Sequence, residues 1–190
     1  SRGLDAFLGE SGGIAAVLRS MRIHGKNANV QAMGCWSLVN LALNHQQKLA
    51  LLALDGLDAV LAAMAHHPTT LEVQFRALFA LINLVIPEAG SVSTNTMDCG
   101  ENAAHARVVR GVLAAMRHFP ESEKLVRCGC LVLHNLSLDD KNVPHLLAFG
   151  VARPLQRAAR SHKDADVQRS AVSTLRRLRV AVAPEHDVLQ

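Results

Sequence analysis

Four pairs of residues have the side chains and the spacing to bind a ligand together. The second member of each pair follows the first by four positions, so both side chains lie on one face of a helix. The pairs are Trp36 with Asn40, Phe79 with Asn83, Leu131 with Asn135, and Ser173 with Arg177. An amide offers a donor and an acceptor and can therefore pair with any peptide unit. The spacing therefore places a large aromatic side chain and an amide side by side in the first two pairs.

Arginines accompany these pairs, and positive charge gathers near the end of the chain. The arginines are Arg76, Arg127, Arg169, Arg176 and Arg177. Residues 1–140 hold 11 Lys and Arg against 12 Asp and Glu, a balance of −1, whereas residues 141–190 hold 9 against 4, a balance of +5. A field of one sign raises the encounter rate with anionic partners. The arginines could equally form a solvated face, and both interpretations stay open.

The segments that carry the pairs recur along the chain. The aligned windows are residues 30–41, 73–84, 125–136 and 167–178. One shared position holds Asn40, Asn83, Asn135 and Arg177, at steps of 43, 52 and 42 residues. A period of about 40–47 residues indicates stacked helical repeats, which bind partners through an extended surface. Hydrophobic residues make up 49% of the chain but aromatic ones only 3%, so the repeats must pack through Leu, Ala, Val and Ile.

A second shared position lies 27 residues before the first and holds Gly13, Gly56, Val108 and Gly150. Glycine tolerates a left-handed backbone, so we expect a sharp corner there between a short and a medium helix. Val108 requires a different corner, for which Gly111 is a candidate. A turn and a long helix follow each corner. Thr69 with Glu72 predicts a capping box at the start of the second long helix.

Three helices per unit, a glycine corner and a late Asn-Leu pair resemble the armadillo repeat over about residues 4–180. The resemblance implies an all-α fold, a right-handed α-α superhelix of about four armadillo repeats with three helices each. Residues 1–190 then form a single armadillo-repeat domain, and the start at Ser1 without a Met suggests a fragment of a longer protein. The expected repeats span about 4–44, 45–86, 101–138 and 141–180, with an inserted loop at about 87–104.

The resemblance also implies which residues bind a partner, because the third helices of an armadillo stack line a concave groove. The pairs are similar to the Trp-x-x-x-Asn ladder of importin-α, in which Asn side chains bond a peptide backbone and Trp indoles form slots. Only Trp36 with Asn40 matches fully, and the acidic groove residues used for basic cargo are missing. The arginines are closer to the basic grooves of β-catenin-like proteins, which bind acidic segments. The predicted partner-binding residues are Trp36, Asn40, Arg76, Phe79, Asn83, Arg127, Leu131, Asn135, Arg169, Ser173 and Arg177.

Structural roles are the alternative for several of these positions. Asn side chains in armadillo repeats often tie neighbouring loops together, and Trp36 could serve in packing rather than as an anchor. The loop at 87–104 is either a tolerated insertion or a site for a partner or a modification.

The sequence offers little for catalysis or metal binding. It has no Gly-rich phosphate loop, nucleophile elbow or paired carboxylates. Cys128-Gly129-Cys130 falls within a helix and lacks the Cys-x(2–4)-Cys spacing of zinc sites, and the histidines fall mostly in turns without partners. We therefore expect no enzyme activity, no metal and no cofactor.

The remaining expectations concern compartment and partners. No apolar run approaches the ~18 residues of a membrane span. Four cysteines are too few for a disulfide framework, which favours the cytoplasm, with the nucleus as an alternative. The apolar residues Leu4, Phe7 and Leu8 would allow self-association through an exposed repeat end.

The leading functional interpretation is a non-catalytic scaffold or adaptor that holds an extended, preferably acidic, protein segment in its groove. One alternative is a regulatory armadillo segment of a larger multidomain enzyme. Another is nucleic-acid or anionic-surface binding through the basic C-terminal repeat. Nucleic acid is the weaker partner because residues 150–180 offer little aromatic interleaving for base stacking.

Overall fold

The residues that the structure describes form α-helices joined by short turns. The computed structural model describes residues 2–86 and 99–182, with side chains over 12–86 and 103–182. Those ranges hold ten α-helices and no strand, so the predicted all-α fold is confirmed. The helices are α1 (Arg2–Ile23), α2 (Ala28–Leu41), α3 (His45–Ala53), α4 (Gly56–His66), α5 (Leu71–Leu84), α6 (Cys99–His118), α7 (Glu123–Leu136), α8 (Asn142–Ala148), α9 (Ala152–Ser161) and α10 (Ala165–Arg177).

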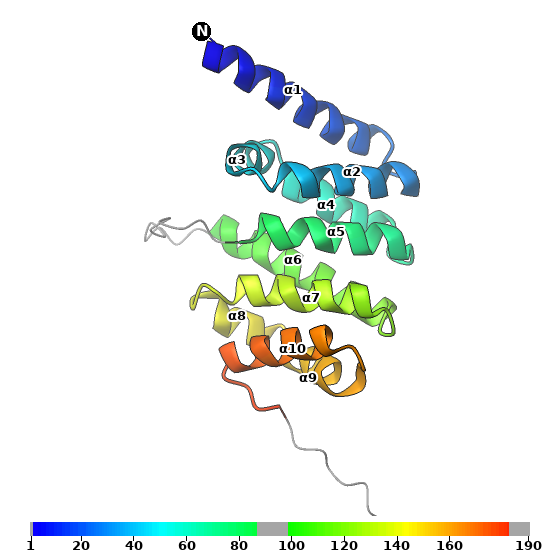
Figure 1. Ribbon diagram of the computed structural model, residues 1–190, viewed down its shortest axis with the longest axis vertical. Coiled ribbons are helices and arrows are strands. Elements are labelled where there is room, and N and C mark those ends of the chain that lie inside the picture. The colour runs from blue at the N-terminus through cyan, green and yellow to red at the C-terminus, as the bar shows by residue number, and fades with distance from the viewer. Residues whose placement is uncertain (1, 87–98, 183–190) are drawn as a thin grey trace, which may run out of the picture.

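The helices stack in two layers (Figure 1). α2, α5, α7 and α10 follow one another along the stack, and each packs on the next. α4 packs on α5, α6 on α7 and α9 on α10, which makes the second layer, while α3 and α8 lie along one edge. We call α2, α5, α7 and α10 the long helices, and the side that they turn away from α4, α6 and α9 the inner face.

Side-chain caps start two of the long helices. The Asn27 carboxamide oxygen accepts the backbone N–H groups of Asn29 and Val30 at 3.1 and 3.2 Å before α2. Asp164 caps α10 in the same way, at 2.8 and 2.9 Å. These oxygens satisfy amide groups that the first helical turn leaves unpaired.

The predicted capping box before α5 is wrong. The N-cap of α5 is Thr70, not Thr69, and its side chain makes no capping bond. Glu72 does not reach back to the cap, because its carboxylate accepts from Nε of Arg76, one turn further along the helix, at 2.6 Å.

A buried glutamine near the start of a long helix fixes the preceding turn. Gln31 donates from Nε2 to the carbonyl oxygens of Met21 (2.9 Å) and His24 (3.0 Å). Gln74 makes the equivalent pair in the second repeat at 2.8 and 2.9 Å, and Gln168 makes one bond of 2.7 Å in the fourth. These amides satisfy carbonyls at the end of the preceding helix. The turns before α2, α5 and α10 therefore share one pattern, whereas the third repeat has Val126 at the aligned position.

The core between the layers is aliphatic. At two glycines of the long helices, a methionine side chain packs directly against the helix backbone. Leu38, Leu81 and Leu133 are fully buried at equivalent positions in successive repeats. A Cβ atom on Gly34 would lie 2.5 Å from Cγ of Met21, and one on Gly129 would lie 2.8 Å from Sδ of Met116. The methionines thus fill space that a larger residue on the long helix would occupy.

Two of the four predicted corners are absent. α1 continues through Gly13, and α6 continues through Val108 and Gly111, so the corners expected there are wrong. Valine has little access to the left-handed conformation that a corner needs. Gly13 has open space where its Cβ would stand, so no close approach forces a break there.

The corners at the other two positions are present. Before α4 the left-handed residue is Asp55, with φ of 61°, and a Cβ atom on Gly56 would lie 2.7 Å from the carbonyl oxygen of Leu51. Gly56 is therefore required for close approach rather than for its backbone angle. Gly150 itself adopts φ of 75° between α8 and α9. Both corners separate the short helix from the medium helix, as predicted.

The predicted loop at 87–104 is shorter than expected on its C-terminal side. α6 begins at Cys99, so residues 99–104 are helical, while residues 87–98 lie outside the described residues. In the described ranges no single helix is long and apolar enough to cross a membrane. Helices α3 and α4 reach the length and apolar composition of a membrane span only when they are taken together, and a bend of 69° separates them.

Candidate functional site

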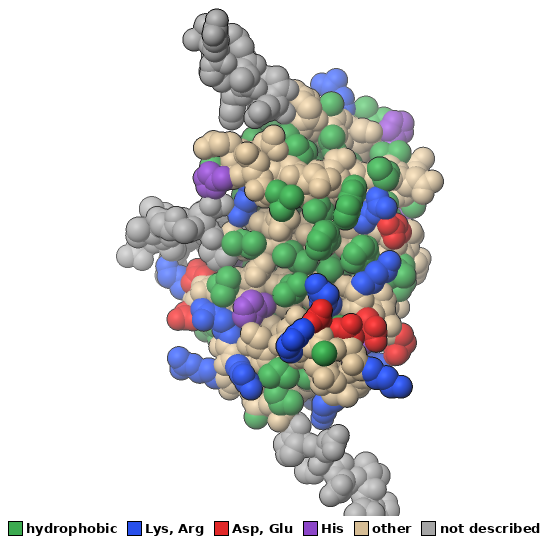
Figure 2. Space-filling model, in the orientation of Figure 1, with side chains coloured by type: hydrophobic (Ala, Val, Ile, Leu, Met, Phe, Trp, Pro, Cys, Tyr) green, Lys and Arg blue, Asp and Glu red, His purple; other side chains and the backbone are tan. Residues whose placement is uncertain are grey.

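The inner face brings the predicted partner-binding residues together on four adjacent helices. α2 carries Trp36 and Asn40, α5 carries Arg76, Phe79 and Asn83, α7 carries Arg127, Leu131 and Asn135, and α10 carries Arg169, Ser173 and Arg177. Figure 2 shows hydrophobic side chains gathered over α2 and α5, and Lys, Arg, Asp and Glu mainly over α7 and α10. The inner face therefore has an apolar half and a charged half.

Three aromatic rings form a continuous stack across α2 and α5. The ring centroid of Trp36 lies 6.0 Å from that of Phe79, and Phe79 lies 6.1 Å from Phe75, with 15° between the ring planes in both pairs. Trp36 is 40% exposed, and both phenylalanines are partly exposed. We call these three rings the aromatic stack. Rings in this offset arrangement attract one another and remain open to further stacking.

Two cations lie against the aromatic stack. The guanidinium carbon of Arg76 lies 5.5 Å from the ring centroid of Trp36, and Nζ of Lys124 lies 4.7 Å from that of Phe75. Arg76 is held in place by Glu72, and it also contacts the sulfur of Met33 at 3.1 Å. The cations fix the rings in position and add positive potential at both ends of the stack.

The amides of the first two pairs remain available at the surface. Asn40 is exposed, and among the described residues it donates only to the carbonyl oxygen of Trp36 in its own helix, at 3.2 Å. The side chain of Asn83 is partly exposed, and it makes no hydrogen bond within the described part of the chain. Both amides can therefore pair with an incoming peptide group without breaking a bond between repeats.

The last two pairs already bond to the neighbouring repeat. Asn135 donates to the carbonyl oxygen of Ile82 near the end of α5, at 2.9 Å. Arg177 donates to the carbonyl oxygens of Ser137 and Leu138, both at 2.6 Å, and lies 3.3 Å from a carboxylate oxygen of Asp140. Arg177 is thus a link between the fourth repeat and the end of α7.

Carboxylates neutralise much of the charge on the inner face. Arg127 lies 3.0 Å from Asp166, and Arg169 also hydrogen-bonds to Asp166. The hydrogen bond from Arg169, together with its charge and that of Arg127, lowers the pKa of Asp166. Two arginines and one carboxylate leave a single net positive charge here. The half formed by α7 and α10 is therefore only mildly basic.

The surroundings of one histidine on α7, His134, change its pKa. Nδ1 of His134 is buried without a hydrogen-bond partner among the described residues. Burial, and to a smaller extent the nearby Arg177 guanidinium, lowers the pKa of His134. The neutral imidazole is thus favoured in the folded chain.

The three cysteines whose side chains the structure describes have the properties of structural residues. Cys35, Cys128 and Cys130 are buried and unpaired. Burial raises the pKa of Cys35 and Cys130 to about 12 and that of Cys128 to about 11, so these thiols are poor nucleophiles near neutral pH. No cluster of three His, Cys, Asp or Glu side chains able to hold a metal occurs in the described ranges.

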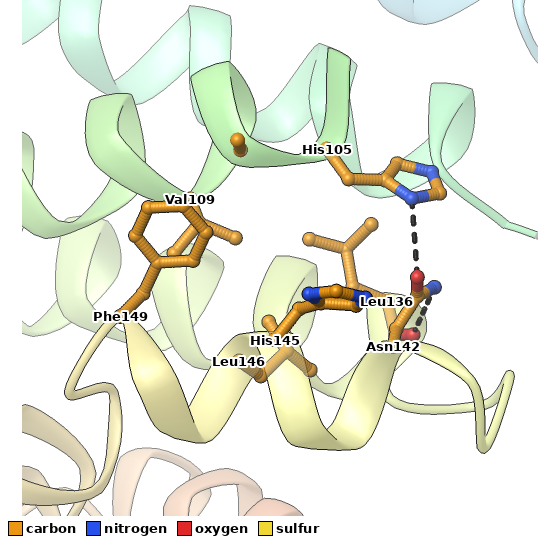
Figure 3. A pocket seen from close by; sticks show the side chains of 8 residues that line it. His105, Val109, Leu136, Asn142, His145, Leu146 and Phe149 are labelled. Atoms are coloured by element: carbon orange, nitrogen blue, oxygen red, sulfur yellow. Dashed lines mark hydrogen bonds between the residues drawn. The ribbon is translucent and has the colours of Figure 1, made fainter. Parts of the chain in front are cut away.

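A separate hollow lies between α6 and α8, away from the inner face (Figure 3). His105, Val109, His145 and Phe149 line this cavity of about 150 Å³. Nδ1 of His105 lies 3.2 Å from Oδ1 of Asn142, which ties α6 to α8 at one side of the cavity. His105 stands within a helix rather than in a turn, and its pairing with Asn142 was not apparent from the sequence.

Stacked long helices, a second layer behind them and short helices along one edge make the chain an armadillo-type α-solenoid with an open inner face. Comparison with known families gives the more specific assignment: the chain belongs to the LRRK2 ARM repeat family, whose model matches residues 14–190. The predicted armadillo resemblance is confirmed, and this region is the repeat part, a non-catalytic fold. A comparison with the curated proteins found no match.

Proposed function

We propose that the chain is a protein-interaction scaffold that binds an extended segment of a partner along the inner face. The observation that carries the proposal is the aromatic stack beside the available amides of Asn40 and Asn83. Exposed aromatic rings are the side chains most often found at the centre of binding sites. The aromatic stack would hold an apolar side chain while the amides hold the backbone on either side.

The charged half would set the orientation of the bound segment along the inner face. Arg127 and Arg169 share one carboxylate, and Arg176 is exposed. An acidic stretch of the partner would therefore lie over α7 and α10, and its apolar anchor over α2 and α5. Electrostatic complementarity of this kind mainly speeds association and selects the register.

A peptide-display selection on the immobilised chain tests this proposal directly. Selected peptides are expected to share an aromatic or large aliphatic residue, and Trp36→Ala combined with Asn83→Ala should weaken them at least about tenfold. Leu43→Ala is the matched control, because Leu43 is 72% exposed but lies in the turn after α2. Peptides that bind the double variant as well as the wild type would exclude the inner-face site.

The alternative that the chain serves as the armadillo segment of a larger multidomain enzyme is favoured by the family match. The surface would be the same, but the bound segment would belong to the same polypeptide. Crosslinking in the full-length protein separates the two cases, since an intramolecular partner gives crosslinks whose yield does not depend on protein concentration.

We also propose a reducing compartment, and the cytoplasm in particular. Three buried, unpaired thiols support this proposal. Microscopy of the tagged full-length protein tests it, and a secreted or lumenal pool would contradict it.

A further inference from the structure

A second hollow with unusual charge lies in the layer behind the long helices. It has a volume of about 240 Å³ and lies between the end of α6, the start of α7 and the outer side of α9. Arg117, Arg153, Arg157 and His162 line its rim. Met116 and Val126 are among its apolar walls. We call this hollow the arginine pocket.

The rim arginines lack the close carboxylate partners that Arg107, Arg127 and Arg169 have. Arg117 and Arg153 are exposed, and no carboxylate of the described residues lies within 4 Å of either. Arg157 lies 3.8 Å from Glu121, and the two side chains are 64% and 90% exposed. An ion pair as long and open as this one neutralises little charge.

The equivalent hollow one repeat earlier is different. It lies between α4 and α6, has a volume of about 400 Å³ and is also lined by two arginines. There Arg107 is paired with Asp58 at 2.5 Å, and Arg110 lies 5.5 Å from the ring centroid of Phe149. The arginine pocket therefore differs in degree: it holds two exposed arginines with no carboxylate of the described residues within 4 Å, whereas in the neighbouring hollow only Arg110 lacks one.

The positions of the arginines on α9 destabilise this helix in two ways. Arg153, Arg157 and Arg160 follow one stripe of the helix, while Leu155 and Ala158 are buried on the other side. Like charges four residues apart destabilise a helix. Arg153 also stands in the first turn of α9, which contains no acidic residue, and the helix dipole disfavours a cation there. A bound anion would relieve both effects.

We propose that the arginine pocket binds a phosphorylated serine or threonine of a protein segment, with a neighbouring apolar side chain against the walls. Several guanidinium groups with free donors match the phosphate oxygens. A pocket fits a compact group better than a membrane surface. A membrane site would need exposed large hydrophobic side chains, and none of those among the described residues lines this pocket. Its lining also holds no Phe, Tyr or Trp ring for base stacking, which disfavours a nucleic acid.

A degenerate peptide library with a fixed central phosphoserine tests the proposal, compared with the same library carrying serine. The phosphorylated library should bind the wild type with at least about tenfold preference. Arg153→Ala combined with Arg157→Ala should remove that preference, and Arg107→Ala, in the neighbouring hollow, should leave it intact. Phenyl phosphate should compete better than inorganic phosphate, because only the former has an apolar part.

Three results would overturn the proposal. One is equal binding of the two libraries, and another is an equal loss in the Arg107→Ala control. The third is binding of phosphatidylserine vesicles or single-stranded RNA that depends on Arg153 and Arg157 while the phosphorylated library fails to bind. The variants Trp36→Ala and Asn83→Ala should not affect this binding, so its outcome is independent of the inner-face proposal.

Discussion

The two halves of the inner face use the same positions of the repeat for different purposes. In the half formed by α2 and α5, the aromatic rings are stacked and the amides of Asn40 and Asn83 stay available. In the half formed by α7 and α10, Asn135 and Arg177 bond to carbonyl groups of the preceding repeat. A side chain that links repeats is not free to bind a partner. A ladder of aligned residues can therefore combine positions that bind a partner with positions that join the repeats.

The largest expected effect that tests this comparison is the loss of Arg177. Arg177→Ala removes two charge-assisted hydrogen bonds to carbonyl oxygens, so the free energy of unfolding should fall by about 2 kcal/mol. Urea denaturation followed by circular dichroism measures the change. Arg177→Lys is the control, and it should recover less than half of the loss because an ammonium lacks the planar fork. Full recovery by lysine would show that charge alone matters there.

The second test compares the two asparagines directly. Asn135→Ala breaks the bond to the Ile82 carbonyl and should lower the free energy of unfolding by about 1 kcal/mol. Asn83→Ala should change it by less than about 0.5 kcal/mol, as is usual at surface positions without a partner. Both values come from the same denaturation experiment. Equal effects at the two positions would break the proposed distinction.

The third test uses the pH dependence that His134 introduces in the charged half. The pKa of His134 is lowered in the folded chain, so the unfolded chain binds more protons once the pH falls below about 6.5. Its contribution to stability is therefore present above that pH and is lost progressively as the pH falls toward the lowered pKa. Stability of the wild type and of His134→Gln should be measured between about pH 7.5 and 5.

The difference between those two curves isolates His134 from the other histidines. We expect the wild type to lose more stability on acidification than the variant. Arg177→Ala should reduce this difference, because the guanidinium is one cause of the lowered pKa. Parallel curves would rule out the proposed contribution of His134.

The smallest expected effect concerns the bridge that Asp166 makes between Arg127 and Arg169. All three side chains are substantially exposed, so Asp166→Asn should change stability only slightly. The same variant should speed association with acidic peptides, because it uncovers a second positive charge, and added salt should cancel the gain. Stopped-flow measurements at two salt concentrations check this. A gain that persists at high salt would contradict an electrostatic cause.

The sequence predicted the long helices and their shared face well, because both depend on local periodicity. Windows aligned on Asn40, Asn83 and Asn135 fell within α2, α5 and α7. The bonding of each ladder residue could not be predicted in the same way, since it depends on distances between helices. Asn83 and Asn135 occupy one aligned position, yet only the second has a carbonyl within reach in the described residues.

Two further features were not predicted correctly from the sequence, each for a physical reason. The corners at Gly13 and Val108 were predicted from alignment, but a glycine permits a break without requiring one. The pairing of cations also escaped prediction, because Arg127 and Asp166 are 39 residues apart and Arg107 and Asp58 are 49 apart. Charge counts along the chain therefore placed the basic region near its end without distinguishing neutralised arginines from open ones.

The contacts between methionine and glycine have a consequence for how this solenoid could evolve or be extended. The aligned position on the long helices reads Gly34, Ala77, Gly129 and Ala171, and the methionine contacts follow the glycines in the first and third repeats. An alanine in place of Gly34 or Gly129 would bring its Cβ atom within 3 Å of Met21 or Met116, so the methionine side chain would have to move. An engineered array that averaged this position over the four repeats would therefore have to repack the methionine beside it in the first and third repeats.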